Sequence, residues 1–387
     1  MKHGLLSSPD SSEPRGESKG SSASLPSTSL RIGERELIAE IRARVPAAPA
    51  WLTVGIGDDA AVAEPPRGAL EIFTTDSLVE SIHFDRRLSA PGDVGWKALA
   101  VNLSDVAAMG ATPRLALLSL GLPDAMDAGE VYALVDGFLS LAGDARVALA
   151  GGNITRSPGP LIVDVTVTGF ARRRQVLTRS GGRAGDDLYV TGEVGAAAAG
   201  LDWWQDRKDT KDTKEPKDTK EPKDTKEPKD TKEPKDTKDM EAAGIEACVM
   251  RHRRPEPRVR IGMLLGRNRA ATACMDLSDG LADAVRQIAE ASGTGAVIDA
   301  AALPVNDAAR AWFARSGCDP ITAAIAGGDD YELLFSAPRR ARGRLATVMR
   351  QARGVPITRI GVLTASREVA VSRAGREEPL PAGFVHF

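Results

Sequence analysis

Five short acidic motifs are the residues of this chain best suited to chemistry. They are the segments Gly55–Ala61, which contains Asp58 and Asp59, Thr74–Asp76, Asn102–Asp105, Asp276–Gly280 and Gly327–Glu332. Two carboxylates ~4 Å apart repel by about 4 kcal/mol at an effective dielectric of about 20, so a group of them needs cations. Oxygen ligands without Cys or His suit Mg²⁺, which in such sites usually carries phosphates. The motifs therefore predict a multi-carboxylate, metal–phosphate site.

Each motif also has a purely structural interpretation. An Asp beside a Gly is more often a turn residue or a helix cap than a metal ligand, and for any single motif that interpretation is favoured. Five such motifs in one chain shift the balance toward a site.

The composition restricts the class of protein. The chain has 387 residues, 42% of them hydrophobic, which allows two domains with a substantial core. Its net charge of −2 argues against a broad nucleic-acid surface. The sequence contains no apolar run of membrane-spanning length and no secretory signal, so we expect a cytoplasmic protein. The cysteines are scattered without metal-binding spacing and are expected to be reduced: Cys248, Cys274 and Cys318.

The pattern along the chain predicts two domains and two disordered segments. Residues 1–30, rich in Ser, Gly, Pro and charge, are expected to be a disordered tail. Residues 31–172 form the first domain and residues 173–387 the second. Residues 206–239, built mostly from Lys-Asp-Thr and Lys-Glu-Pro units, are expected to be a disordered insertion.

Regular elements are predicted to hold the acidic motifs. A strand over 70–74 delivers Asp76, and a helix over 93–109 places Asp105 beside its buried stripe. A strand over 271–275 ends at Asp276, and a helix over 281–291 begins just after Asp279, where a helix N-terminus favours phosphate. Alternatives stay open, because Asp105 could be a solvated helix carboxylate and Asp279 only a helix cap. Strands that alternate with helices indicate a layered α/β or α+β fold.

Basic and glycine-rich segments also allow both functional and structural interpretations. Arg179, beside Ser and Gly, suits a phosphate contact, although a surface arginine at the domain junction is an equal alternative. For the basic segment Arg251–Pro255, a solvated surface cluster is favoured over a phosphate contact. The glycine-rich pieces match neither the P-loop nor the dinucleotide-binding fingerprint.

Taken together and in order, the motifs resemble those of thiamine-monophosphate kinase, in the aminoimidazole-ribonucleotide-synthetase-like superfamily. The resemblance runs from about Gly33 to Phe387 and omits the tail and the insertion. It implies an N-terminal sheet-plus-helix domain, a C-terminal α/β domain, and a homodimer whose N-terminal sheets form a shared barrel with ATP near the interface. It also implies the reaction, in which ATP phosphorylates thiamine monophosphate to thiamine diphosphate by direct in-line transfer.

The resemblance also implies roles for individual residues. The implied Mg²⁺ ligands, several ions per site, are Asp59, Thr74, Thr75, Asp76, Asp105, Asn153, Asp276 and Asp279. The implied nucleotide contacts are Gly152, Asn153, Arg179 and Ser278, and the implied thiamine-phosphate contacts are His83, Asp329 and Phe384. No side chain is expected to act as acid or base, because the acceptor phosphate is largely deprotonated and phosphoryl transfer depends on positioning and charge neutralisation.

Two positions depart from the family pattern. Asn153 stands where the best-known members have a metal-binding Asp, and Asp329 stands where some have Glu. The competing interpretations are another ATP-using member of the superfamily, such as aminoimidazole ribonucleotide synthetase or selenophosphate synthetase, and a non-catalytic metal- or nucleotide-binding relative.

Overall fold

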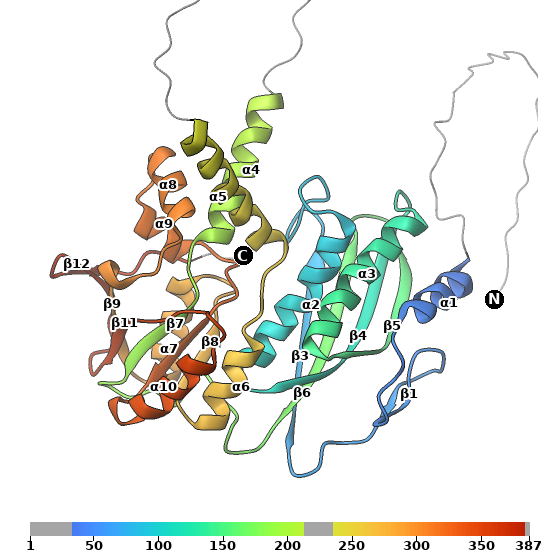
Figure 1. The fold of residues 1–387 in the computed structure, drawn as a ribbon, viewed down its shortest axis with the longest axis horizontal. Helices are drawn as coiled ribbons and strands as arrows, with labels where there is room; N and C mark the ends of the chain where they lie inside the picture. The colour runs from blue at the N-terminus through green and yellow to red at the C-terminus, as the bar shows by residue number, and fades with distance from the viewer. Residues whose placement is uncertain (1–32, 213–234, 384–387) are drawn as a thin grey trace, which may run out of the picture.

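The computed structural model describes residues 33–212 and 235–383, which fold into two layered domains (Figure 1). The N-terminal domain has a four-stranded sheet in the order β3-β6-β4-β5. Its strands are β3 (Leu70–Val79), β6 (Ile162–Ala171), β4 (Thr112–Pro123) and β5 (Ala148–Ser157). β4 and β5 are parallel, whereas β6 runs antiparallel to β3 and to β4. The domain starts with α1 (Glu34–Arg44) and a small hairpin of β1 (Leu52–Val54) and β2 (Val62–Ala63).

One face of this sheet is covered and the other is open. Helices α2 (Pro91–Ala108) and α3 (Ala128–Ala145) cover the face to which Val163, Val165 and Val167 of β6 point (Figure 1). The alternate residues of β6 point to the other face and are only half-buried. Phe73 and Leu117 on that second face are 67% and 39% exposed, so no described element covers it.

The C-terminal domain has a seven-stranded sheet in the order β13-β12-β9-β11-β7-β10-β8. Its strands are β7 (Asp187–Thr191), β8 (Ala273–Asp276), β9 (Gly295–Asp299), β10 (Leu333–Ala337), β11 (Ile357–Thr364), β12 (Val369–Arg373) and β13 (Arg376–Pro379). Its helices are α4 (Ala196–Asp212), α5 (Lys235–Arg253), α6 (Val259–Asn268), α7 (Leu281–Ser292), α8 (Asp307–Arg315), α9 (Pro320–Ala326) and α10 (Arg342–Gln351). None of the helices in the described part of the chain is both long and apolar enough to cross a membrane.

Helix α2 joins the two domains. Its residues Leu99, Leu103 and Val106 belong to the N-terminal core, whereas Ala107 and Ala108 pack with α6 and β10 of the C-terminal domain. Burial therefore surrounds most of this helix, and any polar side chain on it needs a partner.

The α/β architecture is confirmed, with several corrections to individual elements. β3 extends to Val79, so Asp76 lies within the strand and not after it. Both ends of the 206–239 tract are helical, since α4 continues to Asp212 and α5 begins at Lys235. Helix α4 starts in buried sequence, and extending a formed helix is easier than nucleating one. The 1–30 tail and residues 213–234 lie outside the described residues.

Glu332 is the centre of a buried ion-pair network. Its carboxylate is fully buried and accepts two hydrogen bonds from Arg258, at 2.6 and 2.5 Å. Arg251 of α5 donates a third, at 2.7 Å, and the hydroxyl of Thr191 a fourth, at 2.6 Å. The network ties β7, α5 and the start of α6 to the segment before β10.

We expect Glu332→Gln to lower the free energy of unfolding by about 3–5 kcal/mol, because it leaves Arg258 buried without its counter-ion. Glu256 contacts the same two arginines but has a 63% exposed side chain, so Glu256→Gln should cost less than about 1 kcal/mol. Urea denaturation of both variants measures the difference. Equal destabilisation would contradict the network.

Candidate active site

Two glycine turns of the C-terminal domain lie against each other and form one wall of the site. The backbone N–H of Asp329 donates to the carbonyl of Ser278 at 2.8 Å, and that of Tyr331 to the carbonyl of Leu277 at 3.0 Å. Gly280 adopts φ +93°, and a Cβ there would lie 2.5 Å from the carbonyl oxygen of Gly327. The close approach of the turns therefore requires glycine at this position.

Three carboxylates from three elements meet opposite these turns. Asp76 comes from β3, Asp105 from α2 and Asp276 from the end of β8. The hydroxyl of Thr74 donates to Asp105, and the hydroxyl of Ser104 donates to Asp276 at 2.7 Å. Asp105 is thus not a solvated helix carboxylate. Asp279 is not a helix cap either, because Gly280 is the N-cap of α7.

The pKa values of these three acids are raised above the usual range. Burial, then the charge of Asp105 and a hydrogen bond to it, raises the pKa of Asp76 to about 6. Burial, then the charge of Asp105, raises the pKa of Asp276 to about 7. Burial also raises the pKa of Asp105, although the Thr74 hydrogen bond and the charge of Arg179 oppose the rise. The cluster therefore disfavours its own ionisation and would gain from a bound cation.

Two cavities meet at this cluster. The larger, about 730 Å³, is lined by residues of β3, α2, α4 and the two glycine turns. The smaller, about 180 Å³, lies between β3, the end of α2 and β8, and Thr74, Met109 and Arg179 line it. Asp105 and Asp276 line both. The shared carboxylates therefore border both spaces.

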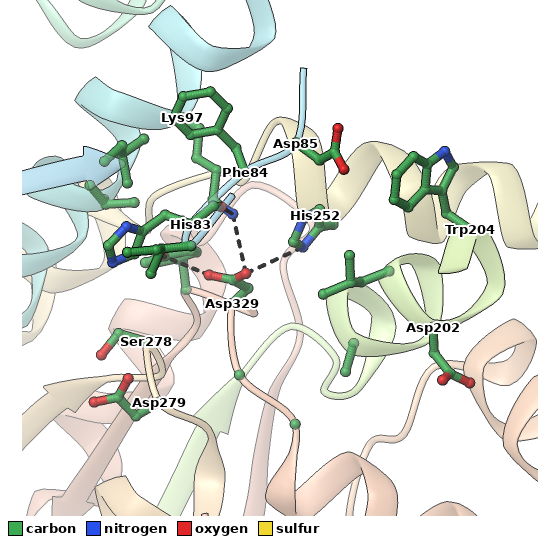
Figure 2. A pocket seen from close by; sticks show the side chains of 18 of the residues that line it. His83, Phe84, Asp85, Lys97, Asp202, Trp204, His252, Ser278, Asp279 and Asp329 are labelled. Carbon is green, nitrogen blue, oxygen red and sulfur yellow. Dashed lines mark hydrogen bonds and ion pairs between the residues drawn. The ribbon is translucent and has the colours of Figure 1, made fainter. Parts of the chain in front are cut away.

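Asp329 lines the larger cavity (Figure 2). Its Oδ2 lies 3.1 Å from Nζ of Lys97 and 3.2 Å from Nδ1 of His252. The hydroxyl of Tyr331 donates to its Oδ1 at 3.0 Å. Burial raises the pKa of Asp329, but the charge of Lys97 and the bond to His252 outweigh it and lower that pKa below the usual range.

Most of the site residues predicted from the sequence line one of the two cavities, and some line neither. The larger cavity is lined by Asp76, His83, Asp105, Asp276, Ser278, Asp279 and Asp329, and the smaller one by Thr74 and Arg179 as well. Four other residues lie in neither cavity: Asp59, Thr75, Gly152 and Asn153. Phe384 lies outside the described residues.

For two of these four residues, the position in the N-terminal sheet explains why they lie outside the cavities. Thr75 hydrogen-bonds to Asp164 and Thr166 of β6, so it points to the open face of the sheet. Asn153 is exposed on β5, opposite Ser119 of β4. β5 and β3 are the two edges of the sheet, which separates Asn153 from Asp76 by three strand spacings, about 14 Å.

Sequence reasoning missed several residues of the cavity. The segment Arg251–Pro255, favoured above as a solvated surface, is instead paired and partly buried. His252 is 3% exposed, and Arg253 and Arg254 both form ion pairs with Asp93 of α2. Lys97 was overlooked because helical periodicity gives no warning of a buried lysine.

The carboxylates of the site suit Mg²⁺ that is also bound by phosphates. Among residues 33–212 and 235–383, no three His, Cys, Asp or Glu side chains are grouped so as to hold an ion by themselves. Mg²⁺ that carries phosphates is usually bound through one or two carboxylates and keeps several waters, so a complete protein cage is not required. The raised pKa values of Asp76 and Asp276 indicate negative charge that such ions would offset.

Comparison with known proteins agrees with this geometry. Residues 57–171 match the AIR synthase related protein N-terminal domain, and residues 183–373 the corresponding C-terminal domain. A thiamine-monophosphate kinase of Escherichia coli O157:H7 is 36% identical over 360 residues, covering 92% of this chain and 99% of the relative. One from Rhodopirellula baltica is 32% identical over 368 residues, covering 91% and 97%.

Solved structures give the same picture. The crystal structure of thiamine-monophosphate kinase from Stenotrophomonas maltophilia K279a is 36% identical, with a TM-score of 0.71, over 87% of this chain and 95% of that one. AaThiL complexed with AMPPCP and TMP is 30% identical, with a TM-score of 0.66, over 92% and 97%. Escherichia coli HypE, a hydrogenase maturation protein at 20% identity and a TM-score of 0.64, shares the fold. From the two matched domains and these full-length relatives, the chain belongs to the thiamine-monophosphate kinase family of AIR synthase related proteins.

Proposed function

We propose that this protein transfers the γ-phosphoryl group of ATP to thiamine monophosphate, giving thiamine diphosphate and ADP. The observation that carries the proposal is the pair of cavities that share Asp105 and Asp276. Two substrates can face each other across these carboxylates, as direct transfer requires. AaThiL, which binds AMPPCP and TMP, supports the choice of substrates.

The proposed roles follow the two cavities. Arg179, which lines the smaller cavity, and Ser278, which lines the larger one, contact the nucleotide, whose phosphates lie at the carboxylates shared by the two cavities. Thiamine monophosphate occupies the larger cavity beside His83 and Asp329, with its phosphate toward the same carboxylates. Two further contacts are proposed, that of Phe384 with the thiamine phosphate and that of Gly152 with the nucleotide.

The side chains of the site position the two substrates and neutralise the charge of their phosphates. The acceptor is a phosphate oxygen, which needs no strong base, so neither His83 nor His252 has to remove a proton. The pKa of His252 is lowered, first by burial and then by Lys97, so its ring is neutral at physiological pH.

We propose that Mg²⁺ is bound by Thr74, Asp76, Asp105, Asp276 and Asp279. When bound there, it would offset the charge of the phosphates and of the transferring group. Asp59, Thr75 and Asn153 belong to the proposed ligands as well, although they lie outside both cavities.

We also propose a homodimer that acts in the cytoplasm. The open face of the N-terminal sheet carries the exposed Phe73 and Leu117, and uncovered apolar faces of this kind mark contact surfaces. A symmetric dimer through this face would also let Asp59, Gly152 and Asn153 serve a site shared between subunits. That arrangement would account for their distance from Asp76 within one chain.

A coupled assay with ATP and Mg²⁺ tests the activity. Thiamine monophosphate should stimulate ADP release and yield thiamine diphosphate, whereas thiamine and aminoimidazole precursors should not. If another acceptor stimulates turnover and thiamine monophosphate does not, the assigned function is wrong.

Asp105→Asn should lower kcat at least tenfold, because it removes a ligand charge that binds the proposed metal. The metal-free variant should melt at or slightly above the wild type at pH 8. A carboxyl with a raised folded-state pKa contributes stability below its unfolded pKa and loses it as pH rises through the folded pKa, and Asn removes that loss. The rise in Tm caused by Mg²⁺ with ADP should shrink in the variant. Asp136→Asn, which removes an exposed carboxylate of α3, is the control.

Leu117→Glu should convert the dimer into a monomer, because it places a charge on the open face of the sheet. Met349→Glu is a matched control, since Met349 is 40% exposed on α10, away from that face. Light scattering at micromolar concentration reports the mass. A wild-type monomer with full activity would exclude the dimer.

A further inference from the structure

Lys97 is a buried cation, and its ammonium group donates hydrogen bonds to two residues that line the larger cavity. Its side chain is 3% exposed. Nζ donates to the carbonyl of His83 at 3.2 Å and to Oδ2 of Asp329 at 3.1 Å. Burying an ammonium group is costly unless it is paired, so a lysine that served only to fill space would be replaced more favourably by an apolar residue.

Asp329 is held on three sides. A carboxylate has about four positions at which it can accept a hydrogen bond. Lys97 of α2 and His252 of α5 contact Oδ2, and Tyr331 donates to Oδ1. Among the described residues, Lys97 donates a hydrogen bond to Oδ2 and Tyr331 donates one to Oδ1, so Oδ1 keeps a further accepting position. The side chain keeps 30% of its surface exposed and borders the cavity (Figure 2).

The charges around Asp329 decide what that position can recognise. Lys97 offsets the carboxylate charge, and His252 is neutral because burial and Lys97 lower its pKa. Tyr331 stays protonated, since burial and then Asp329 raise its pKa. Asp329 therefore presents an ionised acceptor without net charge around it, which suits a neutral N–H donor better than a cation.

The position of Lys97 on α2 indicates which end of the substrate lies here. Lys97, Val101 and Asp105 follow each other at four-residue intervals and all line the same cavity. Eight residues of helix span about 12 Å. With the phosphate at Asp105, the ring end of thiamine monophosphate lies toward Lys97.

We propose that Lys97, together with His252 and Tyr331, is a positioning residue that holds Asp329 so that Oδ1 accepts a hydrogen bond from the amino group of the substrate's pyrimidine ring. The inference rests on the proposed function and deepens it. It makes the enzyme selective for an aminopyrimidine over an analogue that carries an oxo group at the same carbon.

The test compares thiamine monophosphate with oxythiamine monophosphate, in which an oxo group replaces that amino group. For the wild type we expect kcat/KM to be tenfold to a hundredfold higher with the amino substrate, as for a lost hydrogen bond to a charged group. Lys97→Met should raise KM for thiamine monophosphate about tenfold or more, change kcat at saturation much less, and reduce the selectivity to within about threefold. Calorimetric binding of both compounds without ATP should show the same loss.

Two further variants separate positioning from stability. Tyr331→Phe removes only the hydroxyl that donates to Oδ1, and it should also reduce the selectivity; it decides the matter if Lys97→Met does not fold. Arg253→Met removes another cation between α5 and α2, at Asp93 and away from the cavity. It should lower Tm but keep the selectivity.

The outcomes distinguish this inference from the function on which it rests. If the wild type does not turn over thiamine monophosphate, the proposed function fails. If the wild type is active and selective, and a folded Lys97→Met or Tyr331→Phe retains both its KM and its selectivity, the positioning role alone is wrong.

Discussion

Mutual repulsion of buried carboxylates is the constraint around which this molecule is built. Asp76, Asp105 and Asp276 come from a strand, a helix and a second strand, and two of the three belong to the N-terminal domain. Burial raises the pKa of each, and the charge of Asp105 raises those of Asp76 and Asp276 further. A folded chain keeps such a cost only where something else offsets it. Thr74, Ser104 and Arg179 offset part of it within the protein. The remainder explains why the site is suited to cations and phosphates.

The segment Gly327–Glu332 shows how one short stretch can serve both the site and the fold. Asp329 borders the cavity, and Tyr331 donates to it. Asp330 accepts from the backbone N–H groups of Gly195 and Ala197 and so caps the start of α4. Glu332 anchors Arg251 and Arg258. Alternate side chains thus face the cavity and the core, and a shift of one residue would exchange these roles.

The sequence predicted the elements better than the partners. The predicted helix over 281–291 agrees with α7 to within one residue at its end, because apolar periodicity is recognisable locally. Helix α9 was not predicted, although Asp319 and Pro320 are an ordinary start signal for a helix.

Roles that depend on distant partners could not be predicted. Nothing near Glu332 reveals that Arg258 lies against it, and nothing near Lys97 reveals Asp329, 232 residues further on. Motif resemblance selected Asp329 for the substrate, but it said nothing of the three side chains that hold it. Helical periodicity also fails on α2, because a helix buried on nearly all sides has no distinct polar face.

Because Lys97 and Asp105 lie on the same helix, α2 fixes the distance between them. The separation of about 12 Å between the two positions is fixed by helix geometry and does not change with loop motion. In the binding mode proposed above, the acceptor spans from the ring contact to the carboxylates with a single phosphate. Thiamine would end too short of them, and thiamine diphosphate would carry its terminal phosphate too far. The helix would thus limit the enzyme to one phosphoryl transfer per substrate molecule, without any residue devoted to rejecting the product.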